Sequence, residues 1–189
     1  MSILDIRVLG DPVLRQETRL VTEFTDELQR LIDDMFETMR HARGIGLAAP
    51  QVGRAERLAV VDLGDDPFVI INPEVIVSSA ARVRGEEGCL SIPDIYGDVE
   101  RPKSVTVRAL SRHGEPFERD ASDLLARCVQ HEIDHLHGKL FLDYLSVLKR
   151  TAALAKWKLQ AADYPGYVRR VALETPDDLD EHGHREEEL

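Results

Sequence analysis

The pentapeptide His131-Glu132-Ile133-Asp134-His135 combines two imidazoles and a carboxylate at a spacing suited to metal chemistry. Residues four apart lie on one face of a helix, so His131 and His135 can converge on a single ion. Glu132, between them, can take up a proton from a water that the ion makes acidic. This pattern is typical of metal-dependent hydrolases. In these enzymes a third protein ligand joins the two histidines, and one coordination position of the metal stays open for water or substrate.

The third ligand has to come from outside this pentapeptide. One known extension of the motif continues with a glycine and then a further histidine that binds the metal. In this chain Gly138 stands at the glycine position, but Phe141 stands at the histidine position and cannot bind a metal. Another extension uses a glutamate from a following helix, but the chain has no glutamate from Tyr144 to Leu173. Both extensions are therefore excluded.

Two cysteines remain as candidates for the third ligand. Cys128 precedes His135 by seven residues, a helical rise of about 10.5 Å, which favours a place in the wall of the site over a bond to the ion. Cys89 lies outside the helix and can complete a Cys-His-His set, although its spacing alone leaves a core cysteine as an equal alternative. Thiolate and imidazole together suit iron(II), zinc, nickel or cobalt.

Composition places this site in a soluble globular protein. The chain has 189 residues, 43% of them hydrophobic and 31% charged, which fits one domain with a real core. We expect a cytoplasmic protein, because the sequence contains no secretory leader and no apolar run of about 20 residues. Two cysteines make no disulfide framework, and a net charge of −11 argues against specific nucleic-acid binding. No membrane partner is expected, because no apolar run is long enough to span a bilayer.

The acidic residues concentrate at the end of the chain. The stretch from Asp177 to Leu189 reads DDLDEHGHREEEL and offers almost nothing apolar to bury. We therefore predict a catalytic domain over residues 1–165 and an acidic, disordered tail over residues 166–189.

Periodicity predicts the elements that position the motif. A first helix is expected from a cap at Thr25 to Ala42, a second from Asp120 or Ser122 to Gly138, and a last one over residues 146–162. Short β-type runs occupy residues 57–63, 68–72, 74–79 and 104–110, whereas the Gly- and Pro-rich segment 85–102 carries no predicted element. The order indicates an α+β fold, with mostly antiparallel sheets around a central metal-binding helix and with an N-terminal and a C-terminal helix.

Three segments together resemble the signature motifs of peptide deformylases. They are GIGLAAPQ (44–51), EGCLS (87–91) and HEIDH (131–135), and the likeness spans about residues 5–150. The resemblance implies an enzyme that removes formyl from the N-formylmethionine of new bacterial polypeptides. It also implies one divalent ion, usually Fe²⁺ in the cell and replaceable by Zn²⁺, Ni²⁺ or Co²⁺ on purification, with three ligands: Cys89, His131 and His135.

The resemblance also implies roles for further residues. Glu132 accepts the proton of the attacking water and passes it to the departing amine, while the side-chain amide of Gln51 and the backbone N–H of Leu90 stabilise the oxyanion. Gly44 and Gly46 leave room for a peptide to lie against the backbone as an added strand.

The pocket for the methionine side chain shows two departures from the family pattern. The resemblance places this pocket near Ile45, Leu124, Arg127, Cys128 and His131. Arg127 and Gly85 stand where some family members carry aliphatic residues. We expect Arg127 to pack its stem on the pocket and to keep its charged head in water, with a looser preference for methionine as the result.

Other interpretations of these residues carry different functions. Residues 44–49 fit the dinucleotide fingerprint G-x-G-x-x-A, but a helix precedes them in place of a strand, and Pro50 interrupts the helix that should follow. A non-catalytic metal-binding protein and a metallopeptidase both stay open. The expected partner is an N-formylmethionyl nascent peptide. The last predicted helix also carries a cationic stretch, which either docks near the ribosomal exit tunnel or is only a solvated helix face. The stretch consists of Lys149, Arg150, Lys156 and Lys158.

Overall fold

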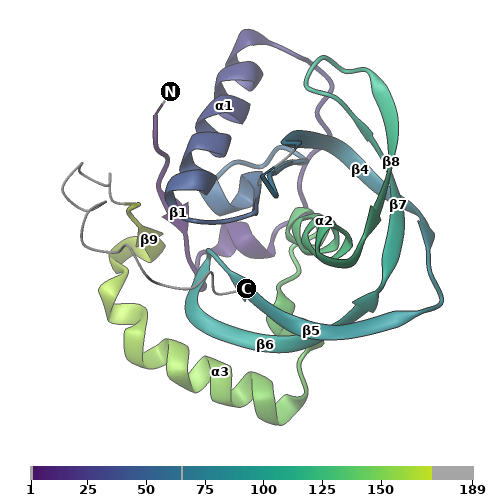
Figure 1. The fold of residues 1–189 in the computed structure, drawn as a ribbon. Coiled ribbons are helices and arrows are strands. Elements are labelled where there is room, and N and C mark those ends of the chain that lie inside the picture. Colours follow the sequence, from purple (N-terminus) through teal and green to yellow (C-terminus); the bar gives the residue numbers. More distant parts are fainter. Residues whose placement is uncertain (1, 65, 172–189) are drawn as a thin grey trace, which may run out of the picture.

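Helix α2 (Asp123–Leu136) lies between a five-stranded sheet and a two-stranded hairpin (Figure 1). The computed structural model describes residues 2–64 and 66–171. Helix α1 (Asp26–His41) packs against the short strands at one end of the larger sheet, and α3 (Val147–Gln160) packs against the hairpin. The predicted α+β fold around a central helix, with one helix before it and one after it, is confirmed.

The described strands pair only in antiparallel fashion. The five-stranded sheet has the order β2-β3-β4-β7-β8, with the bounds Gly46–Ala48, Leu58–Val61, Phe68–Ser78, Ser104–Leu110 and Pro116–Ser122. The hairpin consists of β5 (Arg82–Cys89) and β6 (Ile92–Pro102), and β1 (Ile6–Arg7) pairs with β9 (Val168–Arg169). Short 3-10 turns complete the path at Pro12–Arg15, Ala49–Val52, Phe141–Tyr144, Ala161–Asp163 and Pro165–Tyr167.

Helix α1 begins where the sequence predicts. The Thr25 side chain accepts a hydrogen bond from the Leu28 N–H at 3.3 Å and so satisfies one of the free amides of the first turn. One face of the helix is buried in a core cluster with β2, β3 and β4, through Leu28, Leu31, Ile32, Met35 and Met39. The apolar residues that recur at helical spacing in α1 therefore form the face that packs against the sheet.

Helix α2 uses one side for packing and another for chemistry. Ala126, Val129 and Leu136 join a buried cluster with residues of the five-stranded sheet. The helix ends before Gly138, whose φ is +67° and where a Cβ would lie 2.7 Å from the carbonyl carbon of Arg15. Only glycine adopts this left-handed conformation in so little space without strain. Gly138 therefore stops the helix, and the predicted helix end is confirmed.

The hairpin β5–β6 occupies the segment for which the sequence predicts no element, so that expectation is wrong. Its prolines stand near the strand ends, at Pro93 and Pro102, where they are tolerated. Its glycines give room to neighbouring side chains, since a Cβ would lie 2.8 Å from Tyr96 at Gly88 and 2.9 Å from Leu145 at Gly97. The residues that look like strand breakers thus mark places of close packing.

The end of the described chain returns to its beginning. Residues 166–171 fall within the segment predicted as an acidic tail, yet Val168 and Arg169 pair with Arg7 and Ile6. The start of that segment therefore lies on the domain, and residues 172–189 lie outside the described residues. Within residues 2–64 and 66–171, no helix has both the length and the apolar character needed to cross a membrane.

Candidate metal centre

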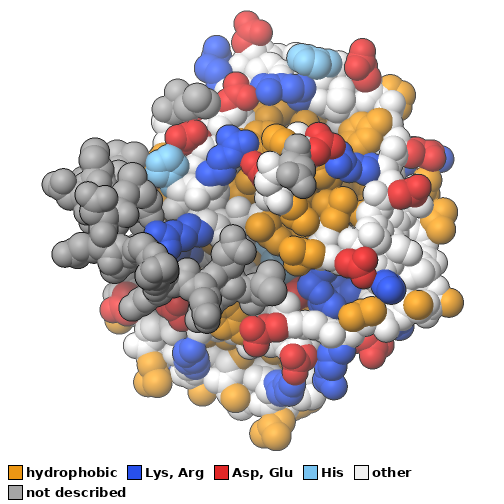
Figure 2. Space-filling model, in the orientation of Figure 1, with side chains coloured by type: hydrophobic (Ala, Val, Ile, Leu, Met, Phe, Trp, Pro, Cys, Tyr) orange, Lys and Arg blue, Asp and Glu red, His pale blue; other side chains and the backbone are white. Residues whose placement is uncertain are grey.

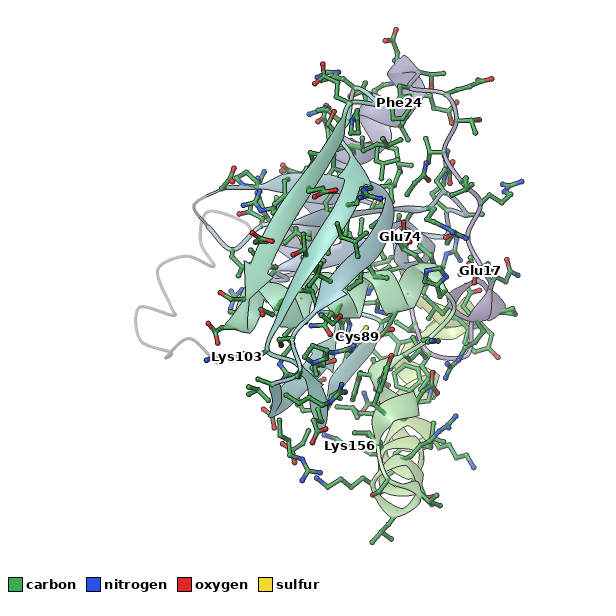
Figure 3. All side chains as sticks on the ribbon, turned by 90° about the vertical axis from the view of Figure 1, so that its right-hand side faces the viewer. Glu17, Phe24, Glu74, Cys89, Lys103 and Lys156 are labelled. Carbon is green, nitrogen blue, oxygen red and sulfur yellow. The ribbon has the colours of Figure 1, made fainter. Side chains whose placement is uncertain are left out.

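Three donor atoms from two elements meet beside α2. The sulfur of Cys89, at the end of β5, lies 3.2 Å from Nε2 of His135, which lies 3.2 Å from Nε2 of His131. All three donor atoms lie within 4.8 Å of one another. Ligand atoms at such separations fit around one ion with the bond lengths of about 2.0–2.3 Å that nitrogen and sulfur ligands adopt. The structure therefore brings together the three predicted ligands, and Figure 3 labels Cys89 near the middle of the molecule.

Two further side chains of potential metal-ligand type, Cys128 and His137, are not part of this cluster. The buried Cys128 thiol points to the carbonyl oxygen of Ile45 at 3.5 Å, and burial raises its pKa well above the ordinary value. His137 contacts the carboxylate of Glu17 at 2.7 Å, away from the other two histidines. Cys128 is therefore not one of the three clustered donors, and its place in the wall of the site stays a prediction.

A buried carboxylate orients one of the imidazoles of this cluster. Nδ1 of His131 donates to Glu87 at 3.0 Å, which leaves Nε2 free to bind an ion. Arg101 donates to both oxygens of Glu87, at 2.6 and 2.9 Å. Burial by itself raises the pKa of Glu87, but hydrogen bonds from Arg101 and His131 outweigh it and lower the pKa to about 2. Glu87 therefore stays ionised and accepts the imidazole N–H.

Sequence reasoning missed both Glu87 and Arg101 as parts of the site. Glu87 stands inside the EGCLS segment, which is the one signal that could have found it. Arg101 follows 14 residues later, and only the pairing of β5 with β6 brings the two together. Arg101 also donates to Asp134 at 2.7 Å, and Asp134 accepts from the Tyr144 hydroxyl at 2.7 Å.

Glu132 carries a carboxylate oxygen with no partner. It is 4% exposed, and Oε2 has no hydrogen bond within the described residues. Burial raises the pKa of Glu132 to about 7, against the lowering effect of the neighbouring His131. A buried acid with one free oxygen beside three metal-type ligands suits the handling of a proton.

Gln51 has one end of its amide fixed and the other directed to the site. Its oxygen accepts from the Ala48 N–H at 2.8 Å. Its nitrogen donates to Ser91 Oγ at 3.2 Å and lies 3.6 Å from the sulfur of Cys89. Because the oxygen is occupied, the donor end faces the cysteine loop.

Comparison with known sequences decides the family. A sequence model described as polypeptide deformylase matches residues 3–151. The chain belongs to the polypeptide deformylase family. The resemblance drawn from the three motifs is confirmed, and so is the expectation of an enzyme.

Individual deformylases match most of the chain. A peptide deformylase from Hydrogenovibrio crunogenus is 52% identical over 166 residues, which cover 86% of this chain and 98% of that protein. Peptide deformylase 1 from Shewanella oneidensis is 53% identical and covers 86% of this chain and 96% of that protein. The crystal structure of a peptide deformylase from Legionella pneumophila has a TM-score of 0.81 and 49% identity, and covers 87% of this chain and 100% of that chain.

Two of the residues that the deformylase resemblance assigns to substrate have exposed side chains. Ile45 is 41% and Leu124 is 45% exposed, large values for apolar side chains. Hydrophobic side chains gather at the middle of the face in Figure 2, where Figure 1 shows α2 end-on. Gly44 lies against Leu90, whose Cδ1 would be 2.7 Å from an added Cβ.

Arg127 of this deformylase lies differently from the expectation. Its side chain is only 14% exposed and it donates to Glu87 at 2.7 Å. The expectation that its charged head lies in water is therefore wrong. The β5–β6 hairpin supplies enough acceptors to bury a guanidinium, and the sequence could not show this because the acceptors are mostly backbone carbonyls.

Proposed function

We propose that this chain removes the formyl group from the N-terminal N-formylmethionine of new polypeptides and releases formate. The observation that carries the proposal is the free oxygen of Glu132 beside the Cys89, His131 and His135 donors. A divalent cation held by these three residues supplies positive charge that acidifies water and polarises the formyl oxygen.

One thiolate and two imidazoles form a donor set that suits iron(II), zinc, nickel and cobalt alike. We assign Fe²⁺ to the enzyme in the cell and expect Zn²⁺, Ni²⁺ or Co²⁺ in samples purified in air. The donor set with three protein ligands favours catalysis over a closed structural site, which would use four.

Proton transfer belongs to Glu132. Its Oε2 takes the proton of the attacking water and later delivers it to the nitrogen of the departing amine, so that formate and a free amino terminus result. A pKa raised to about 7 matches a group that must both accept and release a proton near neutral pH.

Two hydrogen-bond donors stabilise the negative charge that develops on the formyl oxygen. We assign the Nε2 amide of Gln51 and the backbone N–H of Leu90 to this task. The orientation of Gln51 supports its part, because its oxygen is bonded to Ala48 and its nitrogen faces the loop that carries Cys89. Donors of this kind each contribute typically about 3 kcal/mol to catalysis.

The peptide is expected to bind along β2. This strand contains Gly46 and is the first of the order β2-β3-β4-β7-β8, so one of its edges has no strand partner among the described residues. Added-strand binding at that edge places the first side chain near the residues assigned to the methionine pocket: Ile45, Leu124, Arg127, Cys128 and His131.

We place the enzyme in the cytoplasm, where new polypeptides are made. Helix α3 is the candidate for docking near the ribosomal exit tunnel, because it carries four cationic side chains together with the exposed Val147, Leu148 and Leu159. Lys149 of this helix is already paired with Asp98 at 2.8 Å, and Arg150 with Asp143 at 3.4 Å. The charge available for docking therefore comes from Lys156 and Lys158.

Formate release tests the proposed reaction. The protein, loaded with Co²⁺ or Zn²⁺, is given a formyl-Met peptide and the same peptide without formyl. We expect formate only from the former, loss of activity on addition of a chelator, and a fall of about 10²–10⁴-fold in Glu132→Gln at unchanged metal content.

Two results would contradict this reaction. Cleavage of internal peptide bonds in the unformylated peptide would establish a metallopeptidase. Tight metal binding without formate release would establish a non-catalytic metal-binding protein.

A further inference from the structure

The guanidinium of Arg127 is enclosed by the β5–β6 hairpin. It donates to the Glu87 carboxylate at 2.7 Å and to three backbone carbonyls, of Val83 at 2.9 Å, Val99 at 3.0 Å and Gly85 at 3.3 Å. These acceptors come from both strands of the hairpin, whereas Arg127 itself comes from α2. One side chain thus ties the histidine-bearing helix to the strand that ends at Cys89.

The hairpin is shaped to admit this side chain. A Cβ at Gly85 would lie 2.9 Å from Nη2 and 3.0 Å from Cζ of Arg127. Any side chain at residue 85 would therefore displace the guanidinium. The two residues form a matched pair, in which the glycine provides the space that the arginine fills.

Arg127 shares its carboxylate with the imidazole of a metal ligand. Oε1 of Glu87 accepts from Arg127 and from Nε of Arg101, and Oε2 accepts from Nη2 of Arg101 and from Nδ1 of His131. Four donors therefore hold the carboxylate in one orientation, and that orientation sets the direction of the His131 ring. Loss of such an outer partner typically lowers metal affinity by about 10- to 100-fold.

We propose that Arg127 is a positioning residue for the metal centre, which it holds from two sides. On one side it fixes Glu87 and thereby His131. On the other it fixes β5, at whose end Cys89 lies. This inference rests on the proposed use of Cys89, His131 and His135 as metal ligands.

The rate of zinc release tests this role on the intact protein. Zinc-loaded protein is mixed with an excess of a colorimetric chelator at a temperature well below unfolding, and the release rate is recorded. We expect Arg127→Met to release zinc about 10- to 100-fold faster than the wild type, and Arg127→Lys to lie between the two because one ammonium can still reach some acceptors. Unfolding of the metal-free proteins is measured in parallel.

Arg108→Met provides a matched control. Arg108 pairs with Glu118 at 2.8 Å on the far side of the larger sheet, with both side chains more than half exposed. We expect this variant to release zinc at the wild-type rate. Equal rates for Arg127→Met and Arg108→Met would overturn the inference, whatever the effect of either on stability.

The glycine offers a second, independent test. Gly85→Ala is expected to speed zinc release several-fold in the wild type, because the added Cβ displaces the guanidinium. In the Arg127→Met background the same substitution is expected to add nothing, because the group it would displace is absent. An equal effect of Gly85→Ala in both backgrounds would contradict the proposed pairing.

Cys89→Ala separates this inference from the proposed function. If Cys89→Ala loses zinc while Arg127→Met holds it as the wild type does, the ligand assignment stands and the role of Arg127 falls. If Cys89→Ala holds zinc as tightly as the wild type, the ligand assignment itself fails and the inference fails with it.

Discussion

At the scale of single residues, the site depends on groups that leave space as much as on groups that react. Gly46 lies against the carboxylate of Glu132 and the sulfur of Cys128, and a Cβ there would lie 2.8 Å from Cδ of the former and 2.9 Å from Sγ of the latter. The backbone of β2 therefore approaches Glu132, to which we assign the proton transfer, more closely than any side chain at residue 46 would permit.

We expect Gly46→Ala to displace Glu132 and to lower kcat by about tenfold or more, since misplacement of a catalytic group by about 1 Å can cost 10²-fold. Formate release measures the effect, and metal content is expected to stay at the wild-type level. Gly64→Ala is the control, because a Cβ there meets no atom within 4 Å, although the φ of +107° makes it destabilising. Full activity in Gly46→Ala would contradict the placement of Glu132.

Gln51 is a second residue whose orientation can be tested. Gln51→Leu keeps the approximate shape but removes the donor that faces Cys89 and Ser91. We expect kcat to fall by about 10²–10³-fold, the usual effect of losing an oxyanion donor. Gln29→Leu serves as the control, because Gln29 bonds Arg112 away from the site. A loss confined to KM in Gln51→Leu would place the residue in ground-state binding instead.

At the scale of elements, a short turn secures the chain after α2, the helix that carries His131 and His135. The 3-10 turn Phe141–Tyr144 follows α2 and is secured by Asp143, which accepts from Arg15 at 2.5 Å and from the Leu140 N–H at 2.9 Å. Burial raises the pKa of Asp143, but these two hydrogen bonds outweigh it and leave the pKa below its ordinary value of 3.8.

The sign of this pKa shift predicts a pH dependence of stability. A lowered pKa in the folded state means that ionised Asp143 stabilises the fold at neutral pH, and that this contribution is lost as pH falls through the folded pKa. We expect Asp143→Asn to unfold at lower urea concentration than the wild type at pH 7, and the difference to narrow below about pH 4. A difference that stays constant over this range would contradict the assignment.

At the scale of the whole molecule, the last described strand reaches the loop between β5 and β6, which carries Leu90. Nη1 of Arg169 in β9 donates to the carbonyl oxygen of Leu90 at 3.2 Å, and β9 pairs with β1 at the other end of the chain. The Leu9 N–H in turn donates to the Ser91 carbonyl at 2.8 Å. Both ends of the described chain therefore hold the loop that carries Leu90.

We expect Arg169→Met to lower kcat/KM by about fivefold, equivalent to about 1 kcal/mol from one hydrogen bond. The neighbouring Arg170→Met is the matched control, because Arg170 is exposed and lies outside this contact. Steady-state formate release on the two variants is the measurement. Equal activities would show that β9 does not influence the loop.

The sequence by itself determined the elements whose signals are local. Thr25 and the apolar spacing after it placed α1, and Gly138 marked the end of α2, because caps and helix faces depend on residues within a few positions of each other. The family also followed from three short segments, since each carries chemistry that few other arrangements use.

Tertiary structure alone decided what depends on residues far apart in the chain. The resemblance predicted that Cys89, His131 and His135 act together, but only the folded chain brings the sulfur of Cys89 to 3.2 Å from Nε2 of His135 across 46 positions. The same holds for the hairpin β5–β6, where glycines that locally resemble breaks make room for Arg127, Tyr96 and Leu145. Burial of the Arg127 head was unpredictable because most of its partners are backbone carbonyls, which every sequence possesses and only a fold can bring together.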